Sequence, residues 1–480
     1  MRRAKIVATL GPASGSCEMI RSLMKAGMDV VRLNFSHGEH QAHREMIQQV
    51  RAISRELNRP VAIMQDLQGV KIRTRKLKGG KPVELKSGEG FTITTRQLKG
   101  DHRCVSTGYS ALPQDVQAGD RILLSDGLIE LKVLSTSSDE VRCTVVNGGM
   151  LGEKKGINVP GANLSAASLT QKDEKDVLFG IENGVDYIAL SFVRRKEDIL
   201  ALQSILKEAE ADIPVIAKME KPVAIENLEA ILEISDGVMI ARGDLGVEVP
   251  PERVPVLQKL IIRTANRMGK PVITATQMLE SMIHSPRPTR AEASDVANAI
   301  FDGTDAVMLS GETAVGDYPV ESVSIMCRII EEAEAALANF VPREGSEPHT
   351  SFPDAICEAA YHASEVLDTR AVCAFTRTGS TARTIAKYRP QTEIFGLSPD
   401  RRIMRRMCLY WGVRPMNMHA IVNVDELIGM LERTLLDRGL VQTGDDLIIL
   451  TGAPIIEKGH TSLMKLHKVQ GSPSKQMTML

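Results

Sequence analysis

Eight short runs rich in Val, Ile and Leu constrain the fold of this 480-residue chain more than any other feature. The runs are apolar throughout rather than alternating, a pattern typical of parallel strands that are covered on both faces. Amphipathic segments such as 16–27, 197–209 and 255–269 separate most neighbouring runs. This alternation predicts an α/β fold, a (β/α)8 TIM barrel. The predicted strands are residues 4–10, 29–36, 61–67, 186–192, 214–220, 237–242, 271–276 and 306–310.

The interval between the third and fourth strands is too long for a single crossover helix, and its composition differs. Short β-like segments alternate there with turn signals such as Lys-Gly and Asn-Gly-Gly, which predicts a small all-β domain inserted at residues 70–166. Its predicted strands are residues 91–95, 120–127, 129–134 and 141–146.

The stretch 342–353 is the best candidate for a linker, and a second alternating block follows it. That block predicts a separate C-terminal α/β domain with an open sheet. Its predicted strands are 371–376, 393–398 and 445–453, and its predicted helices are 381–389, 402–412 and 425–439. The expected domains are residues 1–69 with 167–342 (barrel), 70–166 (insert) and 343–480 (C-terminal domain).

The net charge is −1, from 59 Lys and Arg against 60 Asp and Glu. This balance lacks the basic excess of proteins that coat nucleic acid or an anionic membrane, so neither partner is expected. No apolar run is long enough to span a bilayer, and the segment after Met1 reads as a strand rather than a signal peptide. The seven cysteines form no C-x-x-C pair, which predicts neither a disulfide framework nor a zinc site. We therefore expect a cytoplasmic protein.

Common nucleotide-binding and hydrolase motifs are absent from the sequence. It contains no G-x-x-x-x-G-K-[ST], no G-x-G-x-x-G after a strand, no H-E-x-x-H and no G-x-S-x-G. A bound nucleotide would therefore need something other than a P-loop. His37, His40 and His43 have helical spacing, so a metal site is conceivable, but the pattern favours a solvated helix start.

Polar residues near the end of the second predicted strand call for an explanation, because barrel strands are covered on both faces. Arg32, Asn34 and Ser36 are two residues apart, so we expect them on one face at the barrel mouth, where such enzymes place their sites. An internal hydrogen-bond network that plugs the barrel is the alternative.

Charged residues end the fifth predicted strand and follow the sixth. Lys218 and Glu220 share a face, and Asp244 lies beside glycines at the rim. Two carboxylates suit Mg²⁺ or Mn²⁺, and Lys218 would supply positive charge where an anion develops. A structural ion pair between Lys218 and Glu220 is the alternative.

Hydroxyl residues end the last two predicted strands. Each precedes a helix start, a position that can bind an anion or simply cap the helix. They are Thr276 on the seventh strand, and Ser310 and Thr313 with Glu312 on the eighth.

Four segments resemble, in order, the pyruvate kinase family. They are VRLNFSHG (31–38), MIARGDLGVEVP (239–250), TATQMLESMIHSPRPTRAEASDVANAIFDGTDAVMLSGETAVGDYP (274–319) and KYRP (387–390). The layout is also similar to that family's: a barrel, a small β-barrel domain inserted after the third strand, and a C-terminal regulatory domain. The resemblance implies a homotetramer that transfers a phosphoryl group from phosphoenolpyruvate to ADP, giving pyruvate and ATP in glycolysis.

The resemblance also implies roles for the matching residues. Arg32 would hold the transferring phosphoryl group, and Glu220 and Asp244 would ligate Mg²⁺. Lys218 would neutralise charge in the transition state and on the enolate that remains. The positions that would bind substrate are Arg32, Lys218, Gly243, Asp244 and Thr276, and those counted as catalytic are Arg32, Lys218, Thr276 and Ser310.

Residues on both sides of the insert match the family's ATP-contacting positions. These residues are Asn34, Phe35, Ser36, His37, Arg73 and Lys155. Because Lys155 belongs to the insert, closure of that domain would complete the site and exclude water.

The segment after the third strand departs from the family pattern. Potassium-dependent members resemble DTKGPEIRT, whereas this chain has DLQGVKIRT at 66–74. The matching monovalent-cation positions are Asn34, Ser36, Asp66 and Leu67, and Lys71 replaces the usual acidic residue. We therefore expect an enzyme that uses Mg²⁺ or Mn²⁺ and does not require K⁺. Potassium bound beside a solvated Lys71 is the alternative.

Small hydroxyl residues and a glycine follow the first predicted strand of the C-terminal domain, a composition that can form a phosphate nest. The segment resembles the family's effector loop, which holds a sugar phosphate. Its residues are Thr376, Arg377, Thr378, Gly379, Ser380 and Thr381. A helix cap alone would explain Ser380 or Thr381 singly, and His460 departs from the expected Gly-Thr-Thr-Asn, which leaves the effector open.

Two other functions remain open at this point. One is a Mg²⁺-dependent aldolase or lyase acting on pyruvate enolate, and the other is an inactive sugar-phosphate sensor. Lys155 argues against a lyase, which has no ADP to clamp. The intact set of charged barrel residues argues against a sensor.

Overall fold

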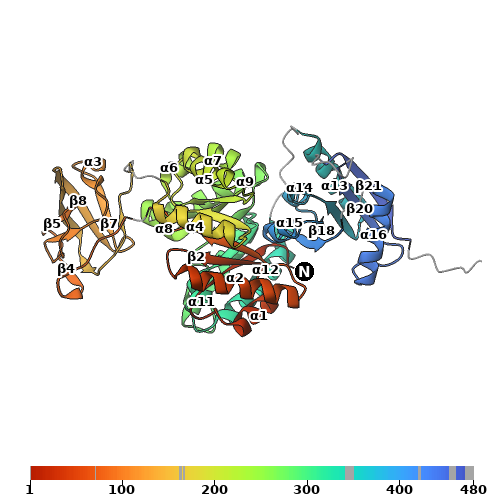
Figure 1. Cartoon of the computed structure of the whole chain (residues 1–480), viewed down its shortest axis with the longest axis horizontal. Coiled ribbons are helices and arrows are strands. Elements are labelled where there is room, and N and C mark those ends of the chain that lie inside the picture. The colour runs from red at the N-terminus through yellow and green to blue at the C-terminus, as the bar shows by residue number, and fades with distance from the viewer. Residues whose placement is uncertain are drawn as a thin grey trace, which may run out of the picture.

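The computed structural model describes residues 2–70, 72–161, 165, 168–340, 351–419, 423–452 and 461–470. The insert lies at one end of the long axis, the barrel in the middle and the C-terminal domain at the other end (Figure 1). We propose the domain boundaries given above. The end of helix α12 at Phe340 and the start of α13 at Phe352 support the last of them.

The eight predicted strands form one closed parallel barrel, which confirms the predicted fold. Its order around the ring is β1-β16-β15-β14-β13-β12-β3-β2. All strands except β2 are buried along their whole length, since side chains fill the interior and helices cover the outside. The strands are β1 (Lys5–Leu10), β2 (Val30–Asn34), β3 (Ala62–Asp66), β12 (Tyr187–Leu190), β13 (Val215–Met219), β14 (Gly237–Ala241), β15 (Val272–Ala275) and β16 (Ala306–Leu309).

The helices around the barrel begin and end where the local sequence provides caps. Thr170 and Thr289 each form a capping box at the start of α4 and α10, and Gly27 ends α1 with a φ of 130°. These helices are α1 (Cys17–Ala26), α2 (His40–Glu56), α4 (Gln171–Glu182), α5 (Lys196–Glu208), α6 (Pro222–Glu226), α7 (Leu228–Ile234), α8 (Arg242–Glu248), α9 (Val254–Arg267), α10 (Arg290–Phe301), α11 (Gly311–Ala314) and α12 (Pro319–Phe340).

The insert is a β domain, as predicted, and its described residues include a short α-helix, α3 (Leu112–Asp115), and a 3-10 turn at Lys78–Gly80. Among the described residues its strands form a six-stranded sheet, β11-β7-β8-β9-β5-β6, and a separate pair, β10-β4. They surround one apolar core. The strands are β4 (Val83–Leu85), β5 (Gly90–Thr94), β6 (Cys104–Ser106), β7 (Arg121–Leu124), β8 (Ile129–Thr136), β9 (Glu140–Asn147), β10 (Gly149–Leu151) and β11 (Ile157–Asn158).

The C-terminal domain is an open sheet of order β19-β18-β17-β20-β21, in which only β21 is antiparallel to its neighbour. The predicted helix at 402–412 is confirmed only in its first part: α15 ends at Arg406, and a turn at Gly412, with φ of 67°, leads into β19. The elements are α13 (Phe352–Leu367), β17 (Ala371–Phe375), α14 (Ser380–Lys387), β18 (Glu393–Ser398), α15 (Arg401–Arg406), β19 (Val413–Asn417), α16 (Val424–Asp437), β20 (Asp446–Thr451) and β21 (Leu463–Lys468).

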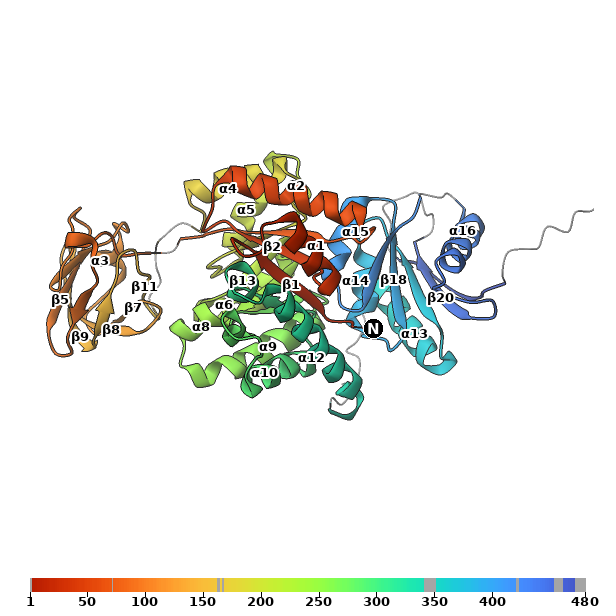
Figure 2. The ribbon, with the colours of Figure 1, turned by 90° about the horizontal axis from the view of Figure 1, so that it is seen from below.

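The C-terminal domain packs against the barrel at the end opposite the insert (Figure 2). The side chains inside the barrel and those on one face of the C-terminal sheet form one continuous apolar cluster. Tyr187, inside the barrel, donates a hydrogen bond of 2.7 Å to the carbonyl of Arg406 on α15. The two domains therefore share buried structure.

Candidate active site

Lys218, near the end of β13, is the centre of a buried charged cluster. Its Nζ lies 2.8 Å from Oε1 of Glu220 and 3.2 Å from Oδ1 of Asp66. It also donates a hydrogen bond of 2.7 Å to Oγ of Ser191. Burial lowers the pKa of Lys218, but the two carboxylates outweigh burial and hold it above its usual value. The side chain is therefore a charged ammonium at the barrel mouth.

Asp66, the last residue of β3, links Lys218 to Arg32. Nε of Arg32 donates to Oδ2 of Asp66 at 2.7 Å, and Nη1 donates to Oγ1 of Thr9 at 3.0 Å. Burial raises the pKa of Asp66, but Lys218 and Arg32 outweigh burial and keep it below its usual value. The guanidinium is thus held at two nitrogens, and Nη2 makes no hydrogen bond to any described residue.

Glu220 follows β13 directly and is 1% exposed. Its Oε2 accepts a hydrogen bond of 2.7 Å from the backbone N–H of Phe192. Oε1 is buried, and within the described ranges its one partner is the ammonium of Lys218 at 2.8 Å. Burial raises the pKa of Glu220, Lys218 opposes this rise and Asp244 adds to it, and the net shift is upward.

Glu220 and Asp244 fit a hard divalent cation. Oε1 of Glu220 keeps free lone pairs, and Asp244 stands in the first turn of α8, close enough to affect the charge of Glu220. No group of three or more His, Cys, Asp or Glu side chains in the described ranges could hold a metal ion. The two carboxylates would therefore need substrate and water as further ligands, as Mg²⁺ sites commonly have.

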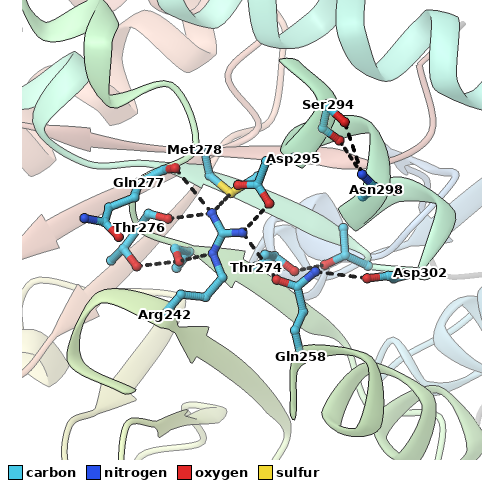
Figure 3. A network of polar contacts seen from close by, with 12 residues as sticks. Arg242, Gln258, Thr274, Thr276, Gln277, Met278, Ser294, Asp295, Asn298 and Asp302 are labelled. Atoms are coloured by element: carbon cyan, nitrogen blue, oxygen red, sulfur yellow. Dashed lines mark hydrogen bonds and ion pairs between the residues drawn. The ribbon is translucent and has the colours of Figure 1, made fainter. Parts of the chain in front are cut away.

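Thr276 follows β15 in a left-handed conformation, with φ of 68°. Its Oγ1 accepts a hydrogen bond of 2.7 Å from the backbone N–H of Gly243 and donates to the carbonyl of Ala275. Figure 3 shows the guanidinium of Arg242 pointing at this turn. Nη2 of Arg242 donates to the carbonyl of Thr276 at 2.7 Å, and Nη1 to Asp295 at 2.7 Å. Arg242 therefore holds an unfavourable turn in place.

Glu312 joins the loop of Ser310 to the loop of Thr276. It is 2% exposed, and burial raises its pKa. Its Oε2 accepts from the backbone N–H of Ser310 at 2.7 Å, and its Oε1 accepts from Leu279 at 3.1 Å. These bonds place the two predicted hydroxyl loops side by side at the mouth.

The predicted ATP-contacting residues of the barrel lie at the end of β2. The strand ends at Asn34, so the prediction of Ser36 on the same strand face was wrong. Oδ1 of Asn34 accepts from the backbone N–H of Ser36 at 3.1 Å, which turns the chain away from the strand. Phe35 is 1% exposed and its carbonyl accepts from Lys172, whereas His37 is exposed.

The other two predicted ATP contacts lie in the segment that runs between barrel and insert. Arg73 forms a β-bridge with Gly156, which places it next to Lys155. Lys155 is exposed, and its backbone pairs with that of Thr74. Asn158 on β11 donates a hydrogen bond of 2.8 Å to Glu248 at the end of α8, which ties the insert to the barrel.

The histidine trio forms no metal site in the described structure. The prediction that the three histidines lie at a solvated helix start was partly wrong. His43 is 4% exposed, and its ring stacks on that of Phe35 with ring centroids 4.2 Å apart. Its Nε2 lies 2.9 Å from the carbonyl of His37, and His40 pairs with Asp176.

Some residues of the predicted effector loop are exposed to solvent and others are buried. Arg377, Thr378 and Ser380 are exposed. Oγ1 of Thr376 accepts from the backbone N–H of Gly379 at 2.8 Å, and Thr381 is buried against Thr461. His460 lies outside the described residues.

Sequence reasoning missed Thr9, Ser191 and Arg242. Thr9 and Ser191 lie at or just beyond the ends of β1 and β12. The rule applied to other strands, polar side chains at the carboxyl end, would have found them. Arg242 directly precedes Gly243 and Asp244, so its position carried the same signal.

Two family models match the chain. The barrel domain of pyruvate kinase matches residues 1–323, and the alpha/beta domain of pyruvate kinase matches residues 354–467. None of the described helices is long and apolar enough to cross a membrane.

Curated relatives and a solved structure agree with these matches. The chain is 47% identical to a pyruvate kinase of Staphylococcus aureus (strain MRSA252) and 46% identical to one of Staphylococcus epidermidis, over 98% of this chain and 81% of each relative. A crystal structure of a pyruvate kinase from Cryptosporidium parvum superposes with a TM-score of 0.90 at 37% identity. It covers 98% of this chain and 96% of that one.

Proposed function

The chain belongs to the pyruvate kinase family, and from this premise we propose how its residues transfer the phosphoryl group of phosphoenolpyruvate to ADP. The observation that carries the assignment of roles is the chain of ion pairs at the barrel mouth, in which Asp66 pairs with Arg32 and Lys218, and Lys218 also pairs with Glu220.

Arg32 and Lys218 stabilise the phosphoryl group in this proposal. Nη2 of Arg32 is available to a phosphate oxygen, while Asp66 and Thr9 fix the plane of the guanidinium. Glu220 and Asp244 would hold Mg²⁺ or Mn²⁺, which when bound would neutralise charge on phosphate and enolate. Lys218 already stands charged beside them, so little reorganisation is needed when charge develops on the enolate.

The loops after β14, β15 and β16 position the acid end of the substrate in this proposal. Gly243 and Thr276 would hold its carboxylate, with the turn of Thr276 fixed by Arg242. Thr276 and Ser310 would lie near the path by which a proton reaches the enolate. The bond from Thr276 to the carbonyl of Ala275 would have to break for its hydroxyl to take part.

The nucleotide would bind between the end of β2 and the insert. Asn34, Ser36 and His37 are accessible on the barrel side, and Phe35 supports them from the interior. Arg73 and Lys155 would approach the phosphates when the insert closes. Such closure would exclude water from the reaction.

A coupled assay of phosphoenolpyruvate-dependent ATP formation tests this function, with the Lys218→Met protein as control. Turnover of the wild type no faster than that of the variant would end the kinase assignment.

We further propose that the enzyme does not require K⁺. Three of the four predicted cation-site residues already have oxygens in hydrogen bonds or ion pairs: Asp66 with Arg32 and Lys218, the carbonyl of Leu67 with Ser191 at 2.8 Å, and Asn34 with the backbone N–H of Ser36. Lys71, whose ammonium would take the place of the cation, lies outside the described residues.

With tetramethylammonium as the only monovalent cation, adding K⁺ is expected to raise activity by less than about twofold, because a fixed charge replaces the bound ion. The Lys71→Glu variant is expected to become K⁺-dependent in the same assay. A rise of about tenfold or more in the wild type would contradict the proposal.

Regulation is proposed at the loop 376–381, where a phosphorylated effector would bind. Arg377 supplies an exposed cation, and Thr378 and Ser380 supply exposed hydroxyls at the start of α14. Gly379, with φ of 91°, allows the turn between them.

A homotetramer is proposed for the assembly. Exposed apolar residues on α9, Val256 at 67% and Leu260 at 47%, support a contact between copies. Light scattering on the purified chain should give a molar mass four times that of one chain. The mass of a single chain across the working concentration range would contradict this.

A further inference from the structure

A small hollow opens to solvent where the barrel meets the C-terminal domain. On the barrel side it is bounded by the segments that lead into β15 and β16, and on the other side by α14 and by the turn before β19. Four of its lining residues carry positive charge and one carries negative charge. They are Lys270, Arg383, Lys387 and Arg389, and Asp305.

Two of the four cations have carboxylate partners. Lys387 lies 3.1 Å from both carboxylate oxygens of Asp354, and Nη2 of Arg389 lies 3.1 Å from Asp305. The other two do not: Lys270 donates to the carbonyl of Ser235 at 2.7 Å, and the guanidinium of Arg383 makes no hydrogen bond or ion pair within the described ranges. The hollow therefore holds about two uncompensated positive charges.

Lys270 and Arg383 repel each other across this hollow. Burial lowers the pKa of Lys270 and the charge of Arg383 lowers it further, while Asp236 opposes both only in part. The carboxylate of Asp236 is also engaged by the backbone N–H of Val215 at 2.9 Å. An anion between the two cations would remove the repulsion and supply the missing acceptors.

We propose that this hollow is a second anion-binding site, and that Arg383 and Lys270 together bind the phosphate group of a small phosphate monoester. A guanidinium offers two parallel donors to a phosphate, and an ammonium adds a third, which matches a dianion. Lys387 and Arg389 surround the group at longer range.

The site is distinct from the catalytic centre and from the effector loop. Lys270 and Asp305 precede β15 and β16, so they lie at the opposite end of the strands from Thr276 and Ser310. Arg383 lies within α14, beyond the loop at the start of that helix. Tyr410 connects the two regions, because it lines the hollow and its hydroxyl would lie 3.3 Å from a Cβ on Gly379.

Trp411 gives a local signal for binding. It is the single tryptophan of the sequence and it lines the hollow. The guanidinium groups of Arg3 and Arg389 lie 5.5 and 5.0 Å from its ring centroid. Titrating the full chain with inorganic phosphate should change the Trp411 emission saturably. Arg383→Ala is expected to raise the phosphate concentration at half-change by about tenfold or more, and Arg383→Lys by less.

Three controls make the result decisive. Arg433→Ala removes an exposed arginine of the same domain and should leave the titration unchanged. Sodium chloride at equal ionic strength should not reproduce the signal. Ser380→Asp, which repels phosphate from the effector loop, should also leave the change in Trp411 emission unaltered. The far-ultraviolet circular dichroism spectrum of each variant shows that it is folded.

The proposal fails if the wild type shows no saturable change up to about 50 mM phosphate. It also fails if chloride acts equally, if Arg383→Ala titrates like the wild type, or if Ser380→Asp abolishes the change. The measurement requires no catalysis, so its outcome is independent of the roles proposed for the active site.

Discussion

Replacing Lys218 by methionine is expected to lower the turnover number for ATP formation by about a thousandfold or more. The ammonium contacts Asp66, Glu220 and Ser191, and in the proposed mechanism it is the cation that stabilises the developing enolate. Methionine keeps most of the length of the side chain but supplies no charge. The measurement is the coupled assay at saturating phosphoenolpyruvate, ADP and Mg²⁺.

The same substitution leaves two buried carboxylates without their shared cation. Removal of one partner from a buried ion pair typically costs about 3–5 kcal/mol of stability, so the loss of activity must be separated from unfolding. Thermal unfolding monitored by circular dichroism, together with binding of phosphoenolpyruvate, makes that separation. A folded variant that binds substrate within a few-fold of the wild type and turns over at more than about a tenth of its rate would refute the role of Lys218.

Replacing Glu220 by glutamine is expected to weaken Mn²⁺ or Mg²⁺ binding by about tenfold or more. The amide has the same size and keeps an oxygen for the N–H of Phe192, but it removes the charge of a 1% exposed ligand. Calorimetric titration of the protein with Mn²⁺ measures this directly and does not depend on activity.

Glu248→Gln provides the matched control for that titration. Glu248 is also a buried carboxylate, paired with Lys221 next to Glu220, but it points to the insert rather than to the proposed metal position. It should change Mn²⁺ affinity much less than Glu220→Gln does. Equal affinity of Glu220→Gln and the wild type would remove Glu220 from the metal site.

The strand pattern predicted the barrel because buried parallel strands need little beyond their own apolar runs to be recognised. All eight runs became strands, each shortened by one to three residues. The shortening has a physical cause. At their carboxyl ends the strands stop where the backbone turns: the N–H of Ser36 is bonded to the side chain of Asn34, and Thr276 has a positive φ.

The contacts between the site residues were harder to predict than the identity of those residues. Sequence spacing placed Arg32 and Lys218 at the mouth, but the bridge between them is Asp66, which had been assigned to a cation site instead. Spacing along one strand does not reveal which neighbour across the barrel a side chain will meet. The same limit explains why Thr9 and Ser191 went unnoticed.

Elements of the C-terminal domain were missed where polar and apolar residues alternate. The strand Leu463–Lys468 has no fully buried residue because it pairs at the sheet edge, and its pattern resembles a loop. The segment 402–412 has helical spacing of apolar residues, yet the glycine at its end allows a turn. In both cases the structure is determined by pairing with another strand of the sheet: β21 pairs with β20, and β19, which follows the turn, pairs with β18.

The hydrogen bond between Asn158 and Glu248 connects the insert directly to the end of α8. That helix begins at Arg242, carries the proposed substrate-binding residues Gly243 and Asp244 in its first turn, and ends with Glu248, which accepts the hydrogen bond from the insert. If the insert rotates relative to the barrel, either the end of α8 moves with it or the hydrogen bond between Asn158 and Glu248 breaks. In the proposed mechanism, α8 would therefore couple the nucleotide site to the metal site, and thermodynamic linkage would require each ligand to alter the affinity of the other by the same factor.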